Sequence, residues 1–226
     1  MTHDPFITGR RMGREGQPLI IIDGFHPDPD ALIADAASRE FGHAGKYYPG
    51  VRADAPAEHL QPCQGVIGEV LSRAFGYAGA RLAETTYSMV TTRPEDLSAI
   101  QRLPHYDGLD ENRIALLHYL TGPEDAGTAF FRHRSTGFEI ITEERFPAYR
   151  DALKGEYPDG PPAGYFSGDE VFERIDEVEP RFNRAVIYRG LCLHTGLVPE
   201  THTFQANPRT GRLTINTFLN GVPGQP

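Results

Sequence analysis

Short runs of β-branched and aromatic residues dominate the chain from residue 82 onward, and they constrain the fold more than any other feature. The densest run is Glu84–Thr92, in which threonine recurs beside a tyrosine and a valine, as is typical of strands. Six more such segments follow: Ile114–Leu120, Thr128–His133, Val171–Glu177, Arg184–Tyr188, His194–Val198 and Leu213–Leu219. A long body built mainly from β-sheet is therefore predicted.

The N-terminal part carries two helical patterns instead. Apolar residues recur at helical spacing in 29–41 and again in 66–77, which predicts two amphipathic helices. We expect Leu19–Asp23 to be a buried strand, 47–62 a loop, and 1–18 a flexible arm. Helices followed by a β-rich body indicate an α+β, mainly β, single domain over 1–226, with the N-terminal helices packed on one sheet.

One helical segment interrupts the strands. Phe146, Tyr149, Leu153 and Tyr157 fall on one face of a helix, which the proline- and glycine-rich run after it would end. Long excursions from a compact core are often functional. We therefore expect 144–165 to be a helical insertion that serves as a lid or a recognition surface.

Composition excludes several classes of function. Hydrophobic residues make up 39% of the chain and charged residues 23%, as in ordinary soluble domains. No apolar run reaches membrane-spanning length. The net charge of −9 disfavours a nucleic-acid partner, because phosphate contacts need a positive field. Cys63 and Cys192 fit no zinc or disulfide spacing, and the N-terminus has no signal pattern. A cytoplasmic protein without nucleic-acid or membrane partners is expected.

The chain contains two His-x-Asp triplets. His26-Pro27-Asp28 stands directly before the first predicted helix, where an aspartate caps the helix and proline is favoured in the first turn. His105-Tyr106-Asp107 precedes a predicted strand. In extended backbone, residues i and i+2 point the same way, so His105 and Asp107 can face one point. The alternative for this second triplet is a surface loop with incidental polar residues.

A distal histidine can complete a set of three metal ligands with the second triplet. His194 follows an apolar strand and a glycine turn and begins another predicted strand. A lone histidine there is more often a hydrogen-bonded core residue than a ligand. With His105 and Asp107, however, it makes two nitrogens and one carboxylate, the set found in non-haem Fe(II) oxygenases. We predict that these three residues bind a metal and carry catalysis.

An arginine with a defined orientation follows. The segment 211–219 alternates, with one face apolar and the other formed by Arg212, Thr214, Asn216 and Phe218. The apolar face would lie beneath the helices, and Arg212 would point into a cavity. A buried arginine is costly unless paired, and a dicarboxylate would pair it through two parallel hydrogen bonds. A salt bridge to an acidic residue is the alternative. Arg209 competes for the same role, although turn residues are usually solvated.

In combination, these motifs resemble the Fe(II)/2-oxoglutarate-dependent dioxygenases, and most of all their prolyl-hydroxylase-like branch. The resemblance spans roughly 19–220 and rests on three segments: the triplet 105–107, the Asn-Arg-x-Val-x-Tyr-x-Gly-x-x-x-His pattern of 183–194, and Gly-Arg-Leu-Thr-Ile-Asn at 211–216. Many relatives place their basic residue nearer to the distal histidine, whereas Glu200–Thr210 is inserted here. A double-stranded β-helix, or jelly-roll, core is what the resemblance implies.

The resemblance also implies a chemistry. Fe(II) would be held by the triad, 2-oxoglutarate by Arg212 with Asn216 and Tyr119 nearby, and O2 would complete the reaction. Halogenating relatives replace the aspartate by a small residue, so the intact Asp107 implies hydroxylation or desaturation. The expected reaction is hydroxylation of an unactivated C–H bond in a small molecule, amino acid or peptide. Two alternatives remain, a jelly-roll protein that binds a metal or small acid without turnover, and a jelly-roll metalloenzyme that does not use 2-oxoglutarate.

Overall fold

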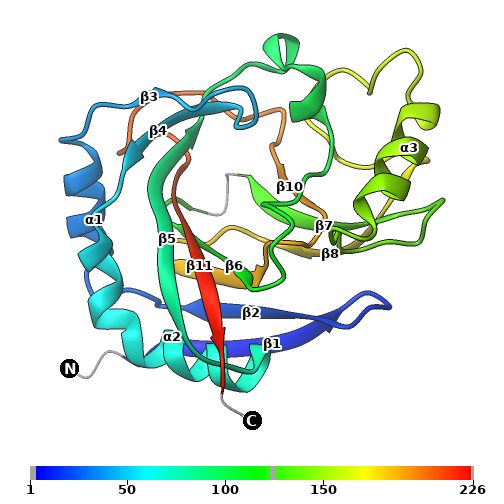
Figure 1. Cartoon of the computed structure of the whole chain (residues 1–226). Helices are drawn as coiled ribbons and strands as arrows, with labels where there is room; N and C mark the ends of the chain where they lie inside the picture. Colours follow the sequence, from blue (N-terminus) through cyan, green and yellow to red (C-terminus); the bar gives the residue numbers. More distant parts are fainter. Residues whose placement is uncertain (1–3, 123–125, 225–226) are drawn as a thin grey trace.

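Two antiparallel sheets and three α-helices make up the computed structural model, which describes residues 4–122 and 126–224. The larger sheet has eight strands in the order β1-β2-β9-β6-β11-β5-β4-β3, and the smaller has three in the order β10-β7-β8. Both sheets are visible in Figure 1, where the larger one curves around the interior and the smaller one lies toward α3. The prediction of a mainly β protein is confirmed.

The strands of the larger sheet come from both ends of the sequence. In chain order they are β1 (Phe6–Met12), β2 (Gln17–Asp23), β3 (Gly42–His43), β4 (Gly50–Asp54), β5 (Tyr77–Val90), β6 (Arg113–Tyr119), β9 (Arg184–Arg189) and β11 (Leu213–Pro223). The smaller sheet consists of β7 (Gly127–His133), β8 (Phe172–Val178) and β10 (His194–Leu197). Every strand predicted from residue 82 onward is therefore present, although β5 begins at Tyr77, well before the predicted Glu84.

Helices cover the outer face of the larger sheet. Helix α1 (Pro29–Ala36) and helix α2 (Gln64–Val70), which continues as a π-helical turn over Leu71–Phe75, lie on the same side of β5 and β11 (Figure 1). Leu213 and Ile215 of β11 share a buried cluster with Leu32 of α1, and Leu219 shares one with residues of α2. The alternation of β11 thus has the predicted phase. No described helix is both long and apolar enough to cross a membrane.

The opposite face of β11 looks into the space between the two sheets. A second buried cluster joins Tyr119 and Phe218 of the larger sheet to Phe130 of the smaller one. Short 3-10 turns at Ala57–Cys63, Pro94–Asp96 and Ala99–Arg102 connect the strands. The polar residues predicted on this face of β11 therefore look into the interior of the molecule.

Two predicted N-terminal segments were wrong. Residues 1–18 do not form a flexible arm over their described part, because Phe6–Met12 is strand β1 and pairs in antiparallel register with β2; residues 1–3 lie outside the described part. The segment 47–62 is not all loop, since β4 occupies Gly50–Asp54 and pairs with β5. In both cases the partner strand, rather than the local sequence, supplies the ladder of backbone hydrogen bonds.

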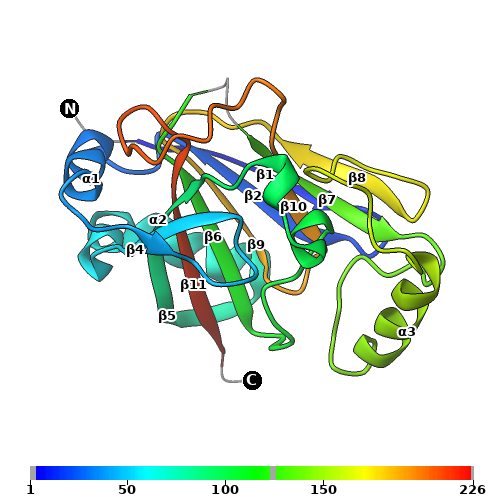
Figure 2. The same ribbon diagram turned by 90° about the horizontal axis from the view of Figure 1, so that it is seen from above.

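The insertion 144–165 contains helix α3 (Phe146–Glu156). Its Tyr149 belongs to a buried cluster with Phe131 and Phe172 of the smaller sheet. Glu156 also binds His133 of β7, with 2.6 Å between Oε2 and Nε2. Helix α3 is therefore packed on the smaller sheet, away from α1 and α2 (Figure 2).

Candidate metal centre

Backbone pairing brings the two histidines of the predicted triad together. His105 and His194 form an isolated antiparallel bridge, in which each amide N–H donates to the other carbonyl at 2.8 Å. The amide of Asp107 donates to the carbonyl of Gly190 at 2.7 Å. The triplet 105–107 is thus bonded at His105 to the first residue of β10 and at Asp107 to the turn before β10.

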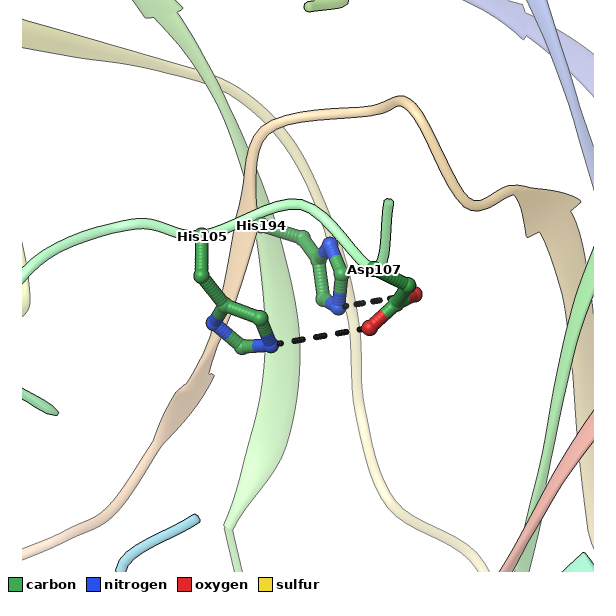
Figure 3. A group of neighbouring side chains, drawn as sticks. All are labelled: His105, Asp107 and His194. Atoms are coloured by element: carbon green, nitrogen blue, oxygen red, sulfur yellow. Dashed lines mark ion pairs between the residues drawn. The ribbon is translucent and has the colours of Figure 1, made fainter. Parts of the chain in front are cut away.

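Three ligand atoms converge on one point (Figure 3). One nitrogen from each histidine and one oxygen of Asp107 all lie within 4.8 Å of one another. The Nε2 atom of His105 is 3.9 Å from Oδ1 of Asp107, and Nε2 of His194 is 3.7 Å from Oδ2. These separations are too long for hydrogen bonds. The three ligand atoms are close enough together to hold one metal ion.

Hydrogen bonding and burial prepare this donor set for a cation. The Nδ1–H of His194 donates to the carbonyl of Cys192 at 2.9 Å, which leaves the Nε2 lone pair facing the centre. Oδ2 of Asp107 is buried without a hydrogen-bond partner among the described residues. Burial raises the pKa of Asp107, opposed by His194, Arg113 and Arg52. A buried carboxylate oxygen with no donor is costly, and a divalent cation would relieve that cost.

His105 provides the open side of the centre. Its side chain keeps 53% of its surface accessible, against 7% for His194 and 10% for Asp107. Partial burial of the ring, together with nearby His194 and Arg52, lowers the pKa of His105. The imidazole is therefore neutral at physiological pH, as a metal ligand must be.

The residue between the two ligands of the triplet points the other way. The ring of Tyr106 contacts Phe146 and Tyr149 of α3, with ring centroids 6.4 Å apart in each pair. The insertion therefore supports the back of the metal-binding loop. This contact gives α3 a structural connection to the centre, whatever else the insertion does.

Arg212 stands directly before β11. It is only 5% exposed, its Nε–H donates to the carbonyl of Ala126 at 2.9 Å, and its guanidinium lies over the ring of Tyr119 at 5.7 Å. The hydroxyl groups of Tyr119 and Thr128 are 2.6 Å apart. No described carboxylate forms an ion pair with Arg212, so the salt-bridge alternative has no partner among the described residues.

The inserted segment 200–210 covers this region. Phe204, which has a positive φ of 53°, stacks on Tyr165 at a centroid distance of 6.0 Å, and Tyr165 donates its hydroxyl to the carbonyl of Thr92 at 2.7 Å. His202 lies against Phe204 and bonds to the carbonyl of Val90 at 3.0 Å. Tyr165 is close enough to Arg212 for the guanidinium charge to act on its hydroxyl group. Stacking of Phe204 on Tyr165 therefore joins the segment 200–210 to the segment after α3.

The other predicted residues fall in different places. Asn216 faces the interior, and its Oδ1 accepts a hydrogen bond from Thr214 at 3.0 Å. Arg209 is exposed in its turn, where its amide N–H donates to the Asn207 side chain at 2.9 Å. A histidine outside these predictions, His118, is on the helix side of β6 and pairs with Asn183 at 2.9 Å, so it does not reach the triad.

Sequence reasoning missed two arginines near the triad. Arg52 of β4 and Arg113 of β6 are both close enough to lower the pKa of Asp107. Arg52 lies in a segment predicted as loop, and only the short alternation Val51-Arg52-Ala53-Asp54 could have signalled a strand there. Arg113 stands immediately before a predicted strand, and nothing in the sequence distinguished it from an ordinary strand end.

The first His-x-Asp triplet has the local role that was predicted. Oδ1 of Asp28 accepts a hydrogen bond from the amide of Ala31 at 3.1 Å and caps α1. Nδ1 of His26 accepts from the amide of Asp28 at 3.0 Å. The pair satisfies backbone donors at the helix start.

One protein family matches nearly the whole chain. Its model, described as "Family of unknown function (DUF6445)", covers residues 3–219. No curated protein matches the chain in sequence.

Solved structures share its fold. The non-heme alpha ketoglutarate dependent epimerase SnoN from nogalamycin biosynthesis matches with a TM-score of 0.51 at 12% identity, over 90% of this chain and 78% of that one. An N-substituted L-amino acid dioxygenase from Burkholderia ambifaria AMMD matches with a TM-score of 0.50 at 14% identity, over 96% and 95%. A Pseudomonas putida prolyl-4-hydroxylase reaches only 0.46 at 14% identity, over 93% and 95%, which does not place the chain in that branch.

Proposed function

The chain belongs to the family of unknown function DUF6445, and we propose that it is a non-haem Fe(II)- and 2-oxoglutarate-dependent oxygenase with a jelly-roll core. One observation carries the proposal: two imidazoles and one carboxylate converge on a single point, and a buried arginine without a carboxylate partner among the described residues lies over Tyr119, which bonds to Thr128 in the sheet that carries His194. The folds of SnoN and of the amino acid dioxygenase are consistent with this function.

The triad would hold the iron on one face. His105, Asp107 and His194 supply two nitrogens and one oxygen, which leaves the opposite positions for co-substrate and O2. When bound, iron and 2-oxoglutarate together would supply the oxidative chemistry, with decarboxylation of the oxo acid. The protein's share is binding, orientation and exclusion of water. The bridge between His105 and His194 fixes the two rings relative to each other.

Arg212 would bind the distal carboxylate of 2-oxoglutarate. Its Nε–H is already used by the carbonyl of Ala126, which holds the side chain in place and leaves the terminal nitrogens for a carboxylate. Tyr119, bonded to Thr128, and Asn216 would complete that site. Tyr165 and Phe204 would keep water away from it. In this low-dielectric setting a charged hydrogen bond is stronger than in water.

The finer parts of the proposal concern the reaction and its setting. The intact Asp107 favours hydroxylation or desaturation, with a small molecule, amino acid or peptide as substrate. The insertion 144–165 would act as a lid or recognition surface on a single domain over 1–226. We place the protein in the cytoplasm, without nucleic-acid or membrane partners.

An anaerobic titration tests this function. Adding Fe(II) and 2-oxoglutarate to the protein should give the weak visible charge-transfer band of the bound pair, and His105→Ala should abolish it. Admitting O2 should then give succinate. If neither band nor succinate forms, the oxygenase proposal is lost.

The same titration separates the alternatives. A band without succinate, even when candidate substrates are added, would indicate a binding protein. Iron binding without any effect of 2-oxoglutarate would indicate a metalloenzyme of another kind. An unchanged 2-oxoglutarate affinity in Arg212→Ala would move the anchor to Arg209 or elsewhere.

A further inference from the structure

A row of polar side chains crosses the interior face of the larger sheet. Arg52 of β4 pairs with Ser88 of β5, Ser88 with Thr214 of β11, and Thr214 with Tyr119 of β6. The two ends of this row are three strand spacings apart, about 14 Å between the backbones. At one end Arg212 lies over the ring of Tyr119, and Arg52 is at the other end.

The two arginines are held in a similar way but differ in exposure. Arg52 lies over the ring of Tyr48 at 4.3 Å, as Arg212 lies over Tyr119 at 5.7 Å. Stacking on an aromatic face fixes the guanidinium plane while its edge stays free for hydrogen bonds. The side chain of Arg52 is 27% exposed, whereas Arg212 is 5% exposed. Arg52 therefore stands at the accessible end of the row.

Arg52 has no adequate partner among the described residues. Its Nε is buried without a hydrogen-bond acceptor. Its single ion pair, to Glu84, has 3.9 Å between Nη1 and Oε1, and the Glu84 side chain is 47% exposed. A pair at that distance and exposure contributes little. A buried guanidinium N–H without an acceptor is costly, so an additional anion would be stabilised here.

The position of Arg52 relative to the metal ligands indicates which molecule that anion would belong to. The strand register puts Arg52 on the same interior face of the larger sheet as Tyr188, and the ring of Tyr188 packs against His194 with the centroids 4.9 Å apart. His105 is the exposed ligand of the triad. A group bound by Arg52 would therefore share the interior space that the metal centre faces, where a primary substrate must come.

We propose that Arg52 binds a carboxylate of the primary substrate, so that the oxidised molecule is a small carboxylic acid such as an amino acid or its derivative. This inference rests on the proposed function, because the metal and the co-substrate define which site remains for the substrate. Arg52 presents a planar pair of donors that matches a carboxylate, and Arg212 is left for the co-substrate. Arg52 is then a determinant of specificity rather than a ligand.

Fragment binding tests the proposal without turnover. The full chain is loaded with Zn(II), a redox-inert and diamagnetic substitute for iron, and with 2-oxoglutarate. A set of small carboxylic acids, amino acids and N-acyl amino acids among them, is compared with the matched amides by ligand-observed NMR. Acids should bind in preference to their amides. Arg52→Met should weaken the bound acids at least 10-fold, and Arg52→Lys should recover part of the loss because a lysine keeps the charge but not the planar fork.

Two further variants serve as controls. Arg73→Met makes the same change at an 80% exposed side chain on the outer helical turn, and it should leave acid binding unchanged. Glu84→Gln removes the loose ion pair, and it too should leave acid binding in place. Thermal unfolding of each variant checks that the fold is retained.

Several results would overturn the proposal. Equal binding of acids and amides, or binding of neither, would remove the carboxylate preference. Loss of acid binding in Glu84→Gln to the same extent as in Arg52→Met would show that Arg52 acts only through its ion pair. A 10-fold weaker affinity for 2-oxoglutarate in Arg52→Met, with acid binding intact, would assign Arg52 to the co-substrate. If neither Zn(II) nor 2-oxoglutarate binds the unaltered protein, the proposed function fails, and this inference fails with it.

Discussion

The two His-x-Asp triplets of this chain have the same spacing but opposite roles. In His26-Pro27-Asp28, both side chains accept hydrogen bonds from backbone amides at the start of α1. In His105-Tyr106-Asp107, the histidine and aspartate side chains accept no such hydrogen bond and face His194 instead. The first triplet satisfies local backbone groups, and the second presents free donor atoms.

The backbone on the C-terminal side of each triplet accounts for the difference. A helix begins after Asp28, and its unpaired N–H groups occupy the carboxylate. After Asp107 the chain turns into β6 without a helix, and its own amide is bonded to Gly190. In this chain, the His–Asp pair that can bind a metal is the one that accepts no hydrogen bonds from neighbouring backbone N–H groups.

The largest expected effect is loss of a metal ligand. His105→Ala should lower Fe(II) affinity by more than about 100-fold, because even partners outside the coordination shell contribute 10- to 100-fold. Isothermal titration under anaerobic conditions measures this. The matched change in the other triplet, His26→Ala, should leave iron affinity unaltered, and a comparable loss there would remove the distinction between the two.

Removal of the buried arginine should have the next largest effect. Arg212→Met should weaken 2-oxoglutarate about 30-fold, since truncating one partner of a buried charged pair costs about 2 kcal/mol or more. Binding of Fe(II) alone should be nearly unchanged. An equal loss of iron affinity would mean that Arg212 supports the fold of the triad rather than the co-substrate.

Acid should destabilise the surroundings of the first triplet. Burial lowers the pKa of His59 to about 4 and that of His118 to about 3, and His26 lies beside His118. Between pH 6.5 and these pKa values, the unfolded chain binds more protons than the folded chain. The folded state therefore has its full stability above pH 6.5 and loses stability as the pH falls. Denaturant titrations should show a loss of about 2 kcal/mol between pH 7 and pH 5 for each of these two histidines, about 4 kcal/mol together, and His59→Gln should remove about half of it.

The smallest effect concerns the helix cap. Asp28→Ala should destabilise the protein by about 1 kcal/mol, seen as a lower midpoint in thermal unfolding. Iron affinity should stay as it was. Asp28→Asn, which keeps an acceptor for the amide of Ala31, should restore most of the stability, and a failure to do so would argue against the capping role.

The strands that carry their own signal could be predicted from the sequence. From Glu84 onward, alternation and β-branched content located every strand, and the predicted phase of β11 was correct. Strands β1 and β4 were missed because charged residues stand among their few apolar ones, and six of the seven residues of β1 are exposed. Such strands exist through pairing with a neighbour, which local patterns do not report.

The candidate site divides in the same way. The triad and Arg212 could be predicted because each stands in a recognisable motif. Arg52 could not, because its position beside the triad depends on β4 lying next to β5. The environment of Arg212 was also hidden, since Tyr165 and Phe204 reach it from two long connections.

The bridge between His105 and His194 has a consequence for how the protein acquires its metal. It joins two segments far apart in the chain, and such distant contacts form only after much of the fold is in place. An unfinished chain has the separate imidazoles but not the pair, so it would hold iron weakly. A ligand that binds only the native state stabilises it by mass action. The melting temperature should therefore rise with metal concentration, and metal loading becomes a measure of completed folding.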